Sequence, residues 1–222
     1  FTQVPRITSW NEHLARAGGL RPLGGMVIER LAPGPRWRRV GELLQQPPTI
    51  ANTYATFRAV FTRREASAIA SSLGVASSAD SVMVDEARVA GDANEVSRLE
   101  LTRYLRNQLV RDSDAASMAC GVELRAPFLD RVLFDATAAV PSAVRLTASK
   151  QLLRDAVPEL PAWVGGPKRC FQFPFADWSK GEWRDTLAAV DAWSPVPTGP
   201  WYRQWCLMVL GDWIERMKVH GG

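Results

Sequence analysis

The chain has 222 residues, and its composition of 46% apolar and 23% charged residues is typical of a soluble protein with one large domain or two small ones. This length and composition exclude a fibrous, miniature or disordered protein, and no uncharged apolar stretch of about 18 residues predicts a membrane span. The net charge of +4 is spread along the sequence, so it does not predict binding to nucleic acid.

The N-terminal segment, residues 1–35, carries paired glycines at 18–19 and 24–25. Glycine pairs are typical of turns, so we expect mostly loop and short helix in this segment. It starts without a methionine and without a signal-peptide pattern, which indicates a piece of a longer protein. A break is expected at residues 46–48, where two prolines occur.

Helical signals dominate the rest of the chain, and we expect a nearly all-α fold. No segment alternates in the way that predicts a strand. Three capping boxes place an N-cap oxygen three residues before a carboxylate, at Thr62 with Glu65, Asp92 with Glu95, and Ser179 with Glu182. Apolar residues at helical spacing predict helices over residues 37–46, 49–60, 64–73, 94–119, 131–140, 150–157, 182–190 and 200–218.

Two of these predicted helices have informative faces. The helix over residues 94–119 has one apolar face and one basic face, and we expect the basic face to be solvated, with contact to a phosphate or partner domain as the alternative. The i, i+3, i+4, i+7, i+8 spacing of the first face is followed by Leu101, Tyr104, Leu105, Gln108 and Leu109, of which Gln108 is polar, and the basic positions are Arg98, Arg103 and Arg106. The last helix is apolar on nearly every side, so we expect it to pack against other helices or a missing domain.

Cysteine and histidine restrict the chemistry open to the chain. Cys120, Cys170 and Cys206 are odd in number and form no CxxC pair, so they predict neither a disulfide framework nor a zinc site. Only two histidines, His13 and His220, are present, and this number argues against a Ser-His-Asp triad and most histidine-based metal sites. We therefore expect no metal site in this chain and a reducing, cytoplasmic location. The oligomeric state is left open.

A nucleotide-binding enzyme commonly carries a glycine-rich phosphate loop, because backbone N–H groups at a helix start cradle the anion. This sequence has no such loop, since its glycine pairs near residue 20 precede no Lys-Ser/Thr pair. Two other segments concentrate charged residues among apolar or aromatic ones.

The first of these segments, residues 117–130, reads SMACGVELRAPFLD. A helix is expected to end near Gly121, and Glu123, Arg125 and Asp130 then follow in a loop stiffened by a proline. Charged groups beside apolar residues must be paired if they are partly buried. The residues are therefore interpreted either as a structural Glu–Arg or Asp–Arg ion pair that holds the loop, or as part of a functional site.

The second segment, residues 167–178, reads PKRCFQFPFADW. Lys168 lies in a loop flanked by glycine and proline and followed by several aromatic residues. A lysine on a rigid loop can neutralise phosphate charge in a desolvated site. The alternative interpretation is a solvated loop lysine.

Taken in order, four blocks resemble the C-terminal part of the synthetase domain of glutamine-hydrolysing asparagine synthetases. The family pattern runs D-x-x-S-M, E-x-R-x-P-F-L-D, K-x-x-L-R and K-x-G-F-x-x-P-x-x-x-W, and the resemblance is strongest over residues 99–178. The matching residues are Asp114, Ser117, Met118, Glu123, Arg125, Pro127, Phe128, Leu129, Asp130, Lys150, Leu153, Arg154, Lys168, Phe171, Pro174 and Trp178.

This resemblance implies an enzyme in which an N-terminal glutaminase domain supplies ammonia to an ATP-pyrophosphatase domain that adenylates aspartate. The family's S-G-G-x-D-S loop, acidic magnesium motif and N-terminal cysteine are absent here. Residues 1–222 would then be the helical C-terminal portion of that domain, inactive alone and requiring no cofactor itself. The intact protein would use ATP and Mg²⁺. Its partners would be the missing glutaminase and pyrophosphate-loop regions and small-molecule substrates, without nucleic acid or membrane.

The resemblance also implies roles for particular residues. Lys168 would be catalytic and would offset charge as pyrophosphate leaves. Substrate-binding or tunnel-lining roles fall to Glu123, Leu124, Arg125 and Ala126, whereas Asp130 and Trp178 would give structural support. Cys170 stands where the family has a glycine, which leaves the substrate open.

Two alternatives remain at this point. One keeps the adenylating chemistry for a different carboxylate, as in related domains that close β-lactam rings or cyclise lasso peptides. The other is a helical interaction module without catalysis. Neither the acceptor carboxylate nor the nitrogen donor follows from the sequence.

Overall fold

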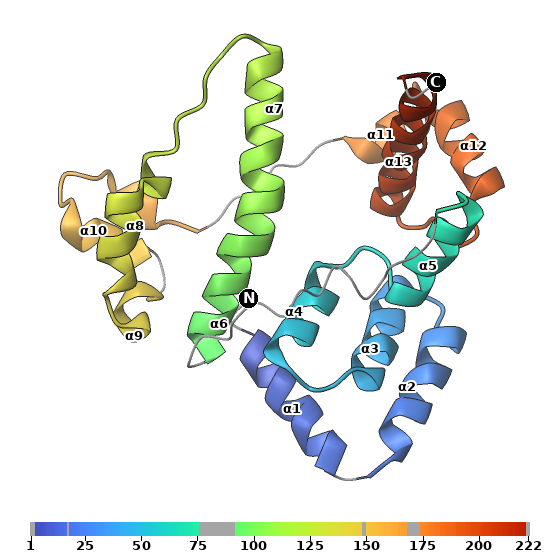
Figure 1. The fold of residues 1–222 in the computed structure, drawn as a ribbon, viewed down its shortest axis with the longest axis horizontal. Coiled ribbons are helices and arrows are strands. Elements are labelled where there is room, and N and C mark those ends of the chain that lie inside the picture. Colours follow the sequence, from blue (N-terminus) through green and yellow to red (C-terminus); the bar gives the residue numbers. More distant parts are fainter. Residues whose placement is uncertain (1–2, 17, 76–91, 148–149, 168–173, 221–222) are drawn as a thin grey trace. The chain divides into compact units, whose positions relative to one another are not determined.

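The computed structural model describes residues 3–16, 18–75, 92–147, 150–167 and 174–220 (Figure 1). All regular elements in these ranges are helical, which confirms the predicted all-α fold. None of the described helices has the length and apolar character needed to cross a bilayer. The chain divides into two compact units. The first unit comprises Phe1–His13, Pro48–Tyr54 and Ala87–Cys170. The second unit comprises Leu14–Pro47, Ala55–Glu86 and Phe171–Gly222.

The first unit is built around a small core where α1 (Val4–Arg16), α4 (Ile50–Arg58) and α6 (Asp92–Leu99) meet. Its buried apolar residues are Val4, Tyr54, Val96 and Leu99, with Ile50 and Ala51 packed against them. Thr8 joins two of these helices, because its hydroxyl donates to the Thr53 hydroxyl at 2.8 Å. The remaining elements are η1 (Glu100–Val110), α7 (Arg111–Ala119), η2 (Pro127–Leu129), α8 (Arg131–Ala138), α9 (Ser142–Arg145), α10 (Gln151–Ala156) and η4 (Ala162–Gly165).

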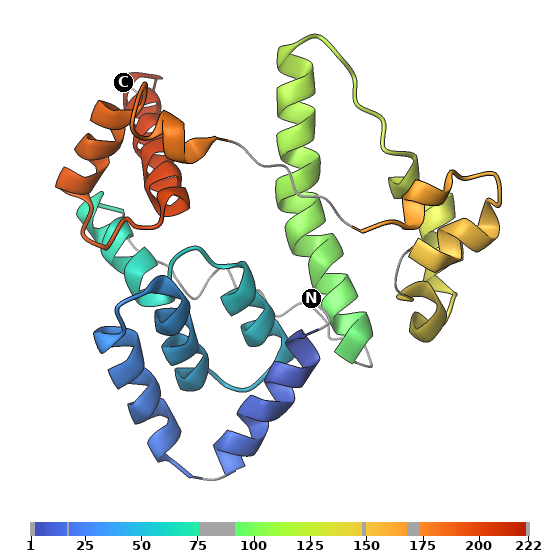
Figure 2. The ribbon, with the colours of Figure 1, turned by 180° about the vertical axis from the view of Figure 1, so that it is seen from behind.

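The long helix predicted over residues 94–119 is confirmed, and Figure 2 shows it as one continuous rod. Its middle part, η1, is a π-helix, whereas α6 and α7 on either side are α-helical. Asp92, the predicted N-cap, is instead the first helical residue. The expectation of a solvated basic face is wrong for Arg98, whose Nη2 lies 2.8 Å from Glu95 Oε1 and whose side chain is 17% exposed. A buried partner three residues earlier draws this arginine inward.

The second unit contains α2 (Leu20–Leu31), α3 (Pro35–Gln45), α5 (Arg63–Ser72), α11 (Phe175–Trp178), α12 (Arg184–Trp193) and α13 (Trp201–His220). Ile69, Val190, Val196 and Leu207 form its buried apolar cluster. The expectation that the last helix packs against other helices is met on the face of Leu207. Other apolar residues of α13 are exposed, among them Val209, Trp213 and Met217.

Residues 1–35 were expected to be mostly loop and short helix, and the loop part of this expectation is wrong, because α1 and α2 have 13 and 12 residues. Gly18 does lie in the connection between α1 and α2, with φ +137°, but Gly25 is inside α2. A Cβ on Gly25 would lie 2.6 Å from the Gly41 carbonyl oxygen, and one on Gly41 would lie 2.4 Å from the Glu29 nitrogen. The glycines therefore permit the backbones of α2 and α3 to touch, which is why they occur within helices rather than turns.

The capping boxes have different outcomes. At Thr62 the box is confirmed, since the Glu65 N–H donates to the Thr62 hydroxyl at 3.2 Å and the Thr62 N–H donates to Glu65 Oε2 at 3.0 Å. The box at Ser179 is wrong, because α12 begins at Arg184 with Trp183 as its N-cap. The aromatic ring of Trp183 packs on Trp178 at a centroid distance of 5.1 Å, and this packing fixes a turn where the helix was expected.

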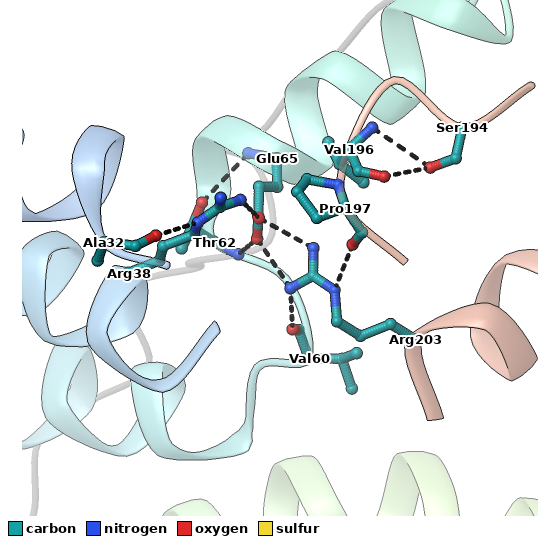
Figure 3. A network of polar contacts seen from close by, with 9 residues as sticks. All are labelled: Ala32, Arg38, Val60, Thr62, Glu65, Ser194, Val196, Pro197 and Arg203. Carbon is teal, nitrogen blue, oxygen red and sulfur yellow. Dashed lines mark hydrogen bonds and ion pairs between the residues drawn. The ribbon is translucent and has the colours of Figure 1, made fainter. Parts of the chain in front are cut away.

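Glu65 is the centre of a buried ionic network in the second unit (Figure 3). Arg203 contacts both of its carboxylate oxygens, at 2.9 and 3.2 Å, and Arg38 Nη1 lies 3.1 Å from Oε1. Arg203 is only 1% exposed and also donates to the carbonyl oxygens of Pro197 and Val60. Each charged group in this network thus contacts a group of opposite charge, and the two guanidinium groups share one carboxylate.

The pKa of Glu65 reflects this pairing. Burial by itself would raise the pKa, but hydrogen bonds from Arg203, the Thr62 N–H and Arg38, together with the charge of Arg203, hold it below its usual value. Glu42 behaves in the opposite way, since burial raises its pKa despite the hydrogen bond from the Arg63 N–H at 2.8 Å. The difference arises because Glu65 has two arginines in direct contact.

Candidate functional site

Residues 117–130, the segment that contains the E-x-R-x-P-F-L-D block, lie in the first unit, where α7 ends and α8 begins. The helix stops in a Schellman motif: the Val122 N–H donates to the Ser117 carbonyl and the Gly121 N–H donates to that of Met118, both at 2.9 Å. Gly121 adopts φ +69°, a conformation that glycine takes without strain. The predicted helix end near Gly121 is therefore confirmed, and it sets the direction in which the loop leaves α7.

Glu123 and Arg125 form the ion pair that one interpretation of the sequence required. Arg125 Nε donates to Glu123 Oε1 at 3.1 Å, and Nη2 donates to Oε2 at 3.4 Å. Their side chains are 69% and 83% exposed, so the pair is held at the surface rather than buried. This fork leaves Arg125 Nη1 without a hydrogen-bond partner among the described residues, and such a group can bind a ligand carboxylate or phosphate.

Asp130 acts locally on the helix that follows. Its Oδ1 accepts hydrogen bonds from the backbone N–H groups of Val132 at 2.9 Å and Leu133 at 3.3 Å, which makes it the N-cap of α8. A 3₁₀ turn, η2, precedes it and starts at Pro127. Cap and turn together stiffen the loop that carries Glu123 and Arg125.

Leu124 and Ala126 flank Arg125 on this loop. Leu124 is 54% exposed, and Ala126 is exposed as well. Val122, Phe128 and Val132, which lie close to them in the sequence, have 58%, 64% and 78% exposure. Several apolar side chains near the ion pair in the sequence are thus exposed, and the tunnel-lining role of Leu124 and Ala126 stays a prediction.

The third family-like block, Lys150 to Arg154, opens α10. Lys150 has φ +56°, in the left-handed region, and precedes the first turn of the helix. Arg154 lies against Gly165 of η4, where an added Cβ would be 2.8 Å from Arg154 Nη1. Sequence reasoning missed Gly165. Nothing in the sequence near Gly165 indicates this contact, because only the fold brings the glycine next to the long side chain of Arg154.

The fourth block is described only in part. Lys168 and Cys170 lie outside the described residues, so the predicted role of Lys168 stays a prediction. Trp178 belongs to an aromatic cluster of the second unit, in which Phe175 packs edge-on against it at a centroid distance of 5.3 Å. Phe175 also stacks on Trp201 at 3.9 Å. These contacts are consistent with structural support by Trp178.

Within the described ranges, no group of three or more His, Cys, Asp or Glu residues is arranged to hold a metal ion. The loop between α7 and α8 offers an arginine held by a carboxylate, with exposed apolar side chains near them in the sequence.

Comparison with known proteins gives two matches. The model of the family described as asparagine synthase matches residues 6–207. Asparagine synthetase [glutamine-hydrolyzing] 1 of Bacillus subtilis (strain 168) is 32% identical over 95 residues, which is 41% of this chain and 15% of the length of that relative. The chain therefore spans only a small part of the curated relative that it matches. No solved structure gives a significant match.

Proposed function

Because this chain belongs to the asparagine synthase family, we propose that it is the helical C-terminal portion of an ATP-dependent, AMP-forming amide synthetase. In this proposal the complete protein is cytoplasmic and converts aspartate to asparagine through an aspartyl-adenylate, with glutamine as nitrogen donor. The glutaminase and pyrophosphate-loop regions would complete the site and hold ATP and Mg²⁺. The 222-residue chain alone would not release pyrophosphate.

The observation that supports this proposal most is the loop between α7 and α8. A Schellman motif at Gly121 and the Asp130 cap stiffen its two ends, and the Glu123–Arg125 fork lies between them. A rigid loop can position an arginine and an apolar wall for a small substrate without an ordering cost at each turnover. In the proposal, Arg125 orients the substrate and Leu124 and Ala126 line the path of ammonia.

Lys168 is proposed as the residue that touches the reacting phosphate. A compact ammonium fixed near the bridging oxygen offsets the negative charge that develops as pyrophosphate leaves. Removing one such preorganised charge slows the chemical step by roughly a hundredfold or more. Arginine would replace it poorly, because a planar guanidinium does not fit a site shaped for an ammonium.

The test uses the complete protein that contains this chain and the variants Lys168→Ala and Lys168→Arg. Single-turnover formation of AMP from ATP and aspartate should fall at least a hundredfold in Lys168→Ala and recover little in Lys168→Arg, while melting curves stay unchanged. Lys180→Ala, at an exposed lysine just after α11, is the matched control. Equal rates in all four proteins would refute the role of Lys168.

A second candidate is adenylation of a carboxylate other than aspartate. It is favoured by Cys170, which stands where the family pattern has a glycine. The cysteine adds a side chain two residues after Lys168, the residue proposed to contact phosphate. The same single-turnover assay with aspartate and with other carboxylic acids separates the candidates. AMP formation with another acid and none with aspartate would select the second.

A further inference from the structure

A small cavity of about 180 Å³ lies in the second unit beside the start of α5. Four parts of the chain supply its walls: the end of α2, the helix α3, the first turn of α5, and the segment Pro195–Pro197 between α12 and α13. Its charged and hydroxyl-bearing residues are Glu29, Arg30, Arg38, Thr62, Arg64 and Glu65. None of the asparagine-synthetase-like blocks contributes to these walls.

Both carboxylates of the cavity already have partners. Glu65 is bound by Arg203 and Arg38. Glu29 Oε2 accepts a hydrogen bond from the Gln45 amide at 2.7 Å. Neither carboxylate is therefore an open site for a cation.

The arginines differ in this respect. The side chains of Arg30 and Arg64 are exposed and make no hydrogen bond or ion pair with any residue that the structure describes. Arg38 donates through Nε and Nη1, and its Nη2 has no partner within the described ranges. Counting Arg203 beside Glu65, four arginines face two glutamates, which leaves an excess of positive charge around the cavity.

We propose that this cavity binds a phosphate group through Arg30, Arg38 and Arg64. A phosphate carries about −1.5 to −2 charges at neutral pH, which matches the local excess, and its several oxygens can be shared among three guanidinium groups. A carboxylate has fewer oxygens and less charge to satisfy them. The cavity is also smaller than the roughly 300–1,000 Å³ of sites that enclose whole drug-sized ligands, so it suits the phosphate rather than an entire nucleotide.

The network around Glu65 holds one arginine of this cavity in place. Glu65 holds Arg38 at 3.1 Å, and Arg38 Nε is fixed in addition by the Ala32 carbonyl at 3.2 Å (Figure 3). One arginine of the three is thus oriented before any ligand arrives, which lowers the entropic cost of binding. The exposed Arg30 and Arg64 would close on the anion from α2 and α5.

The test titrates the 222-residue chain with inorganic phosphate by calorimetry at constant ionic strength, with acetate as the comparison anion. We expect one site with a Kd of about 1 mM or below, and weaker binding of acetate. The double variant Arg30→Gln/Arg64→Gln should weaken phosphate binding roughly tenfold or more. The control Arg111→Gln/Arg131→Gln removes the same charge from exposed positions of the first unit and should bind phosphate as the parent chain does.

Melting curves check that all variants fold. The proposal is overturned by the absence of phosphate binding, by equal binding of acetate, or by equal losses in both double variants. A parallel sedimentation with vesicles that contain phosphatidic acid identifies the source of the phosphate. Binding to these vesicles without binding of free phosphate would also overturn the proposal, because it would indicate a membrane surface rather than a site for a soluble anion.

Discussion

The same chemical pair, glutamate with arginine, occurs in both units at similar distances but in opposite surroundings. Arg203 Nη2 lies 2.9 Å from Glu65 Oε1, and Arg125 Nε lies 3.1 Å from Glu123 Oε1. The first pair is almost fully buried, whereas the side chains of the second are 83% and 69% exposed. Distance therefore says little about what each pair contributes to stability.

Burial determines how much each ion pair contributes to stability. A buried charge that loses its partner stays desolvated and uncompensated, whereas an exposed charge is simply rehydrated by water. The pair in the second unit thus ties α13 to the start of α5. The pair in the first unit costs little to break, so a requirement for it would reflect function rather than folding.

The largest expected effect follows loss of the buried arginine. Arg203→Ala should lower the free energy of unfolding by about 3–5 kcal/mol, because Glu65 would stay buried with only Arg38 as partner. Urea unfolding followed by tryptophan fluorescence measures the change. Arg216→Ala is the matched control: Arg216 lies on the same helix, 2.9 Å from Asp212, but is 75% exposed. Equal losses in both variants would contradict the role given to burial.

The contact between α2 and α3 should give the next largest effect. Gly41→Ala places a Cβ 2.4 Å from a backbone nitrogen of α2, and overpacking of this kind costs about 1–3 kcal/mol. Gly24→Ala in α2 is the control, since its Cβ would meet nothing within 4 Å and should instead stabilise the helix by up to about 1 kcal/mol. Thermal unfolding of both variants should shift in opposite directions. A shift of the same sign would show that the helices do not touch there.

The pH dependence of stability gives a separate test of the buried pair. The pKa of Glu65 is lower in the folded state than its ordinary value of 4.5, so its contribution is present above about pH 4.5 and is lost as the pH falls through the folded-state pKa. The destabilisation caused by Glu65→Gln should therefore be larger at neutral pH than in acid. Urea unfolding at several pH values tests this. The raised pKa of Glu42 acts with the opposite sign, and Glu65→Gln removes one of the negative charges that raise it.

The smallest effect is expected at the exposed pair. Glu123→Gln should change the free energy of unfolding by less than about 0.5 kcal/mol, because water replaces the lost contact. Differential scanning calorimetry of the 222-residue chain is the measurement. A loss of several kcal/mol would mean that the loop holds the first unit together, and the contrast between the two pairs would fail.

Local features were the predictable ones. The Thr62–Glu65 box and the helix over residues 94–119 follow from residues close in sequence, and so does the pairing of Glu123 with Arg125. The Arg203–Glu65 pair joins residues 138 positions apart, and nothing near either residue indicates it. The glycines of α2 could not be assigned from the sequence, because a close helix contact and a turn favour the same residue type.

In the candidate site, too, local features could be predicted from the sequence, whereas contacts between different elements could not. The helix end at Gly121 and the charged loop after it could be predicted from spacing, because each contact spans only a few residues. The close approach of Gly165 and Arg154, in contrast, joins residues of two different helices. Such contacts depend on the tertiary fold rather than on local pattern.

The π-helical segment η1 has a consequence for how relatives of this chain should be aligned. Its i→i+5 hydrogen bonds let Glu100–Val110 hold more residues per turn than the α-helices before and after it. Losing one residue there would return the segment toward α-helical winding and leave the sequences of α6 and α7 intact. A single-residue gap between otherwise similar sequences therefore belongs inside this segment, and an alignment that moves the gap into α7 would mispair the block that begins at Asp114.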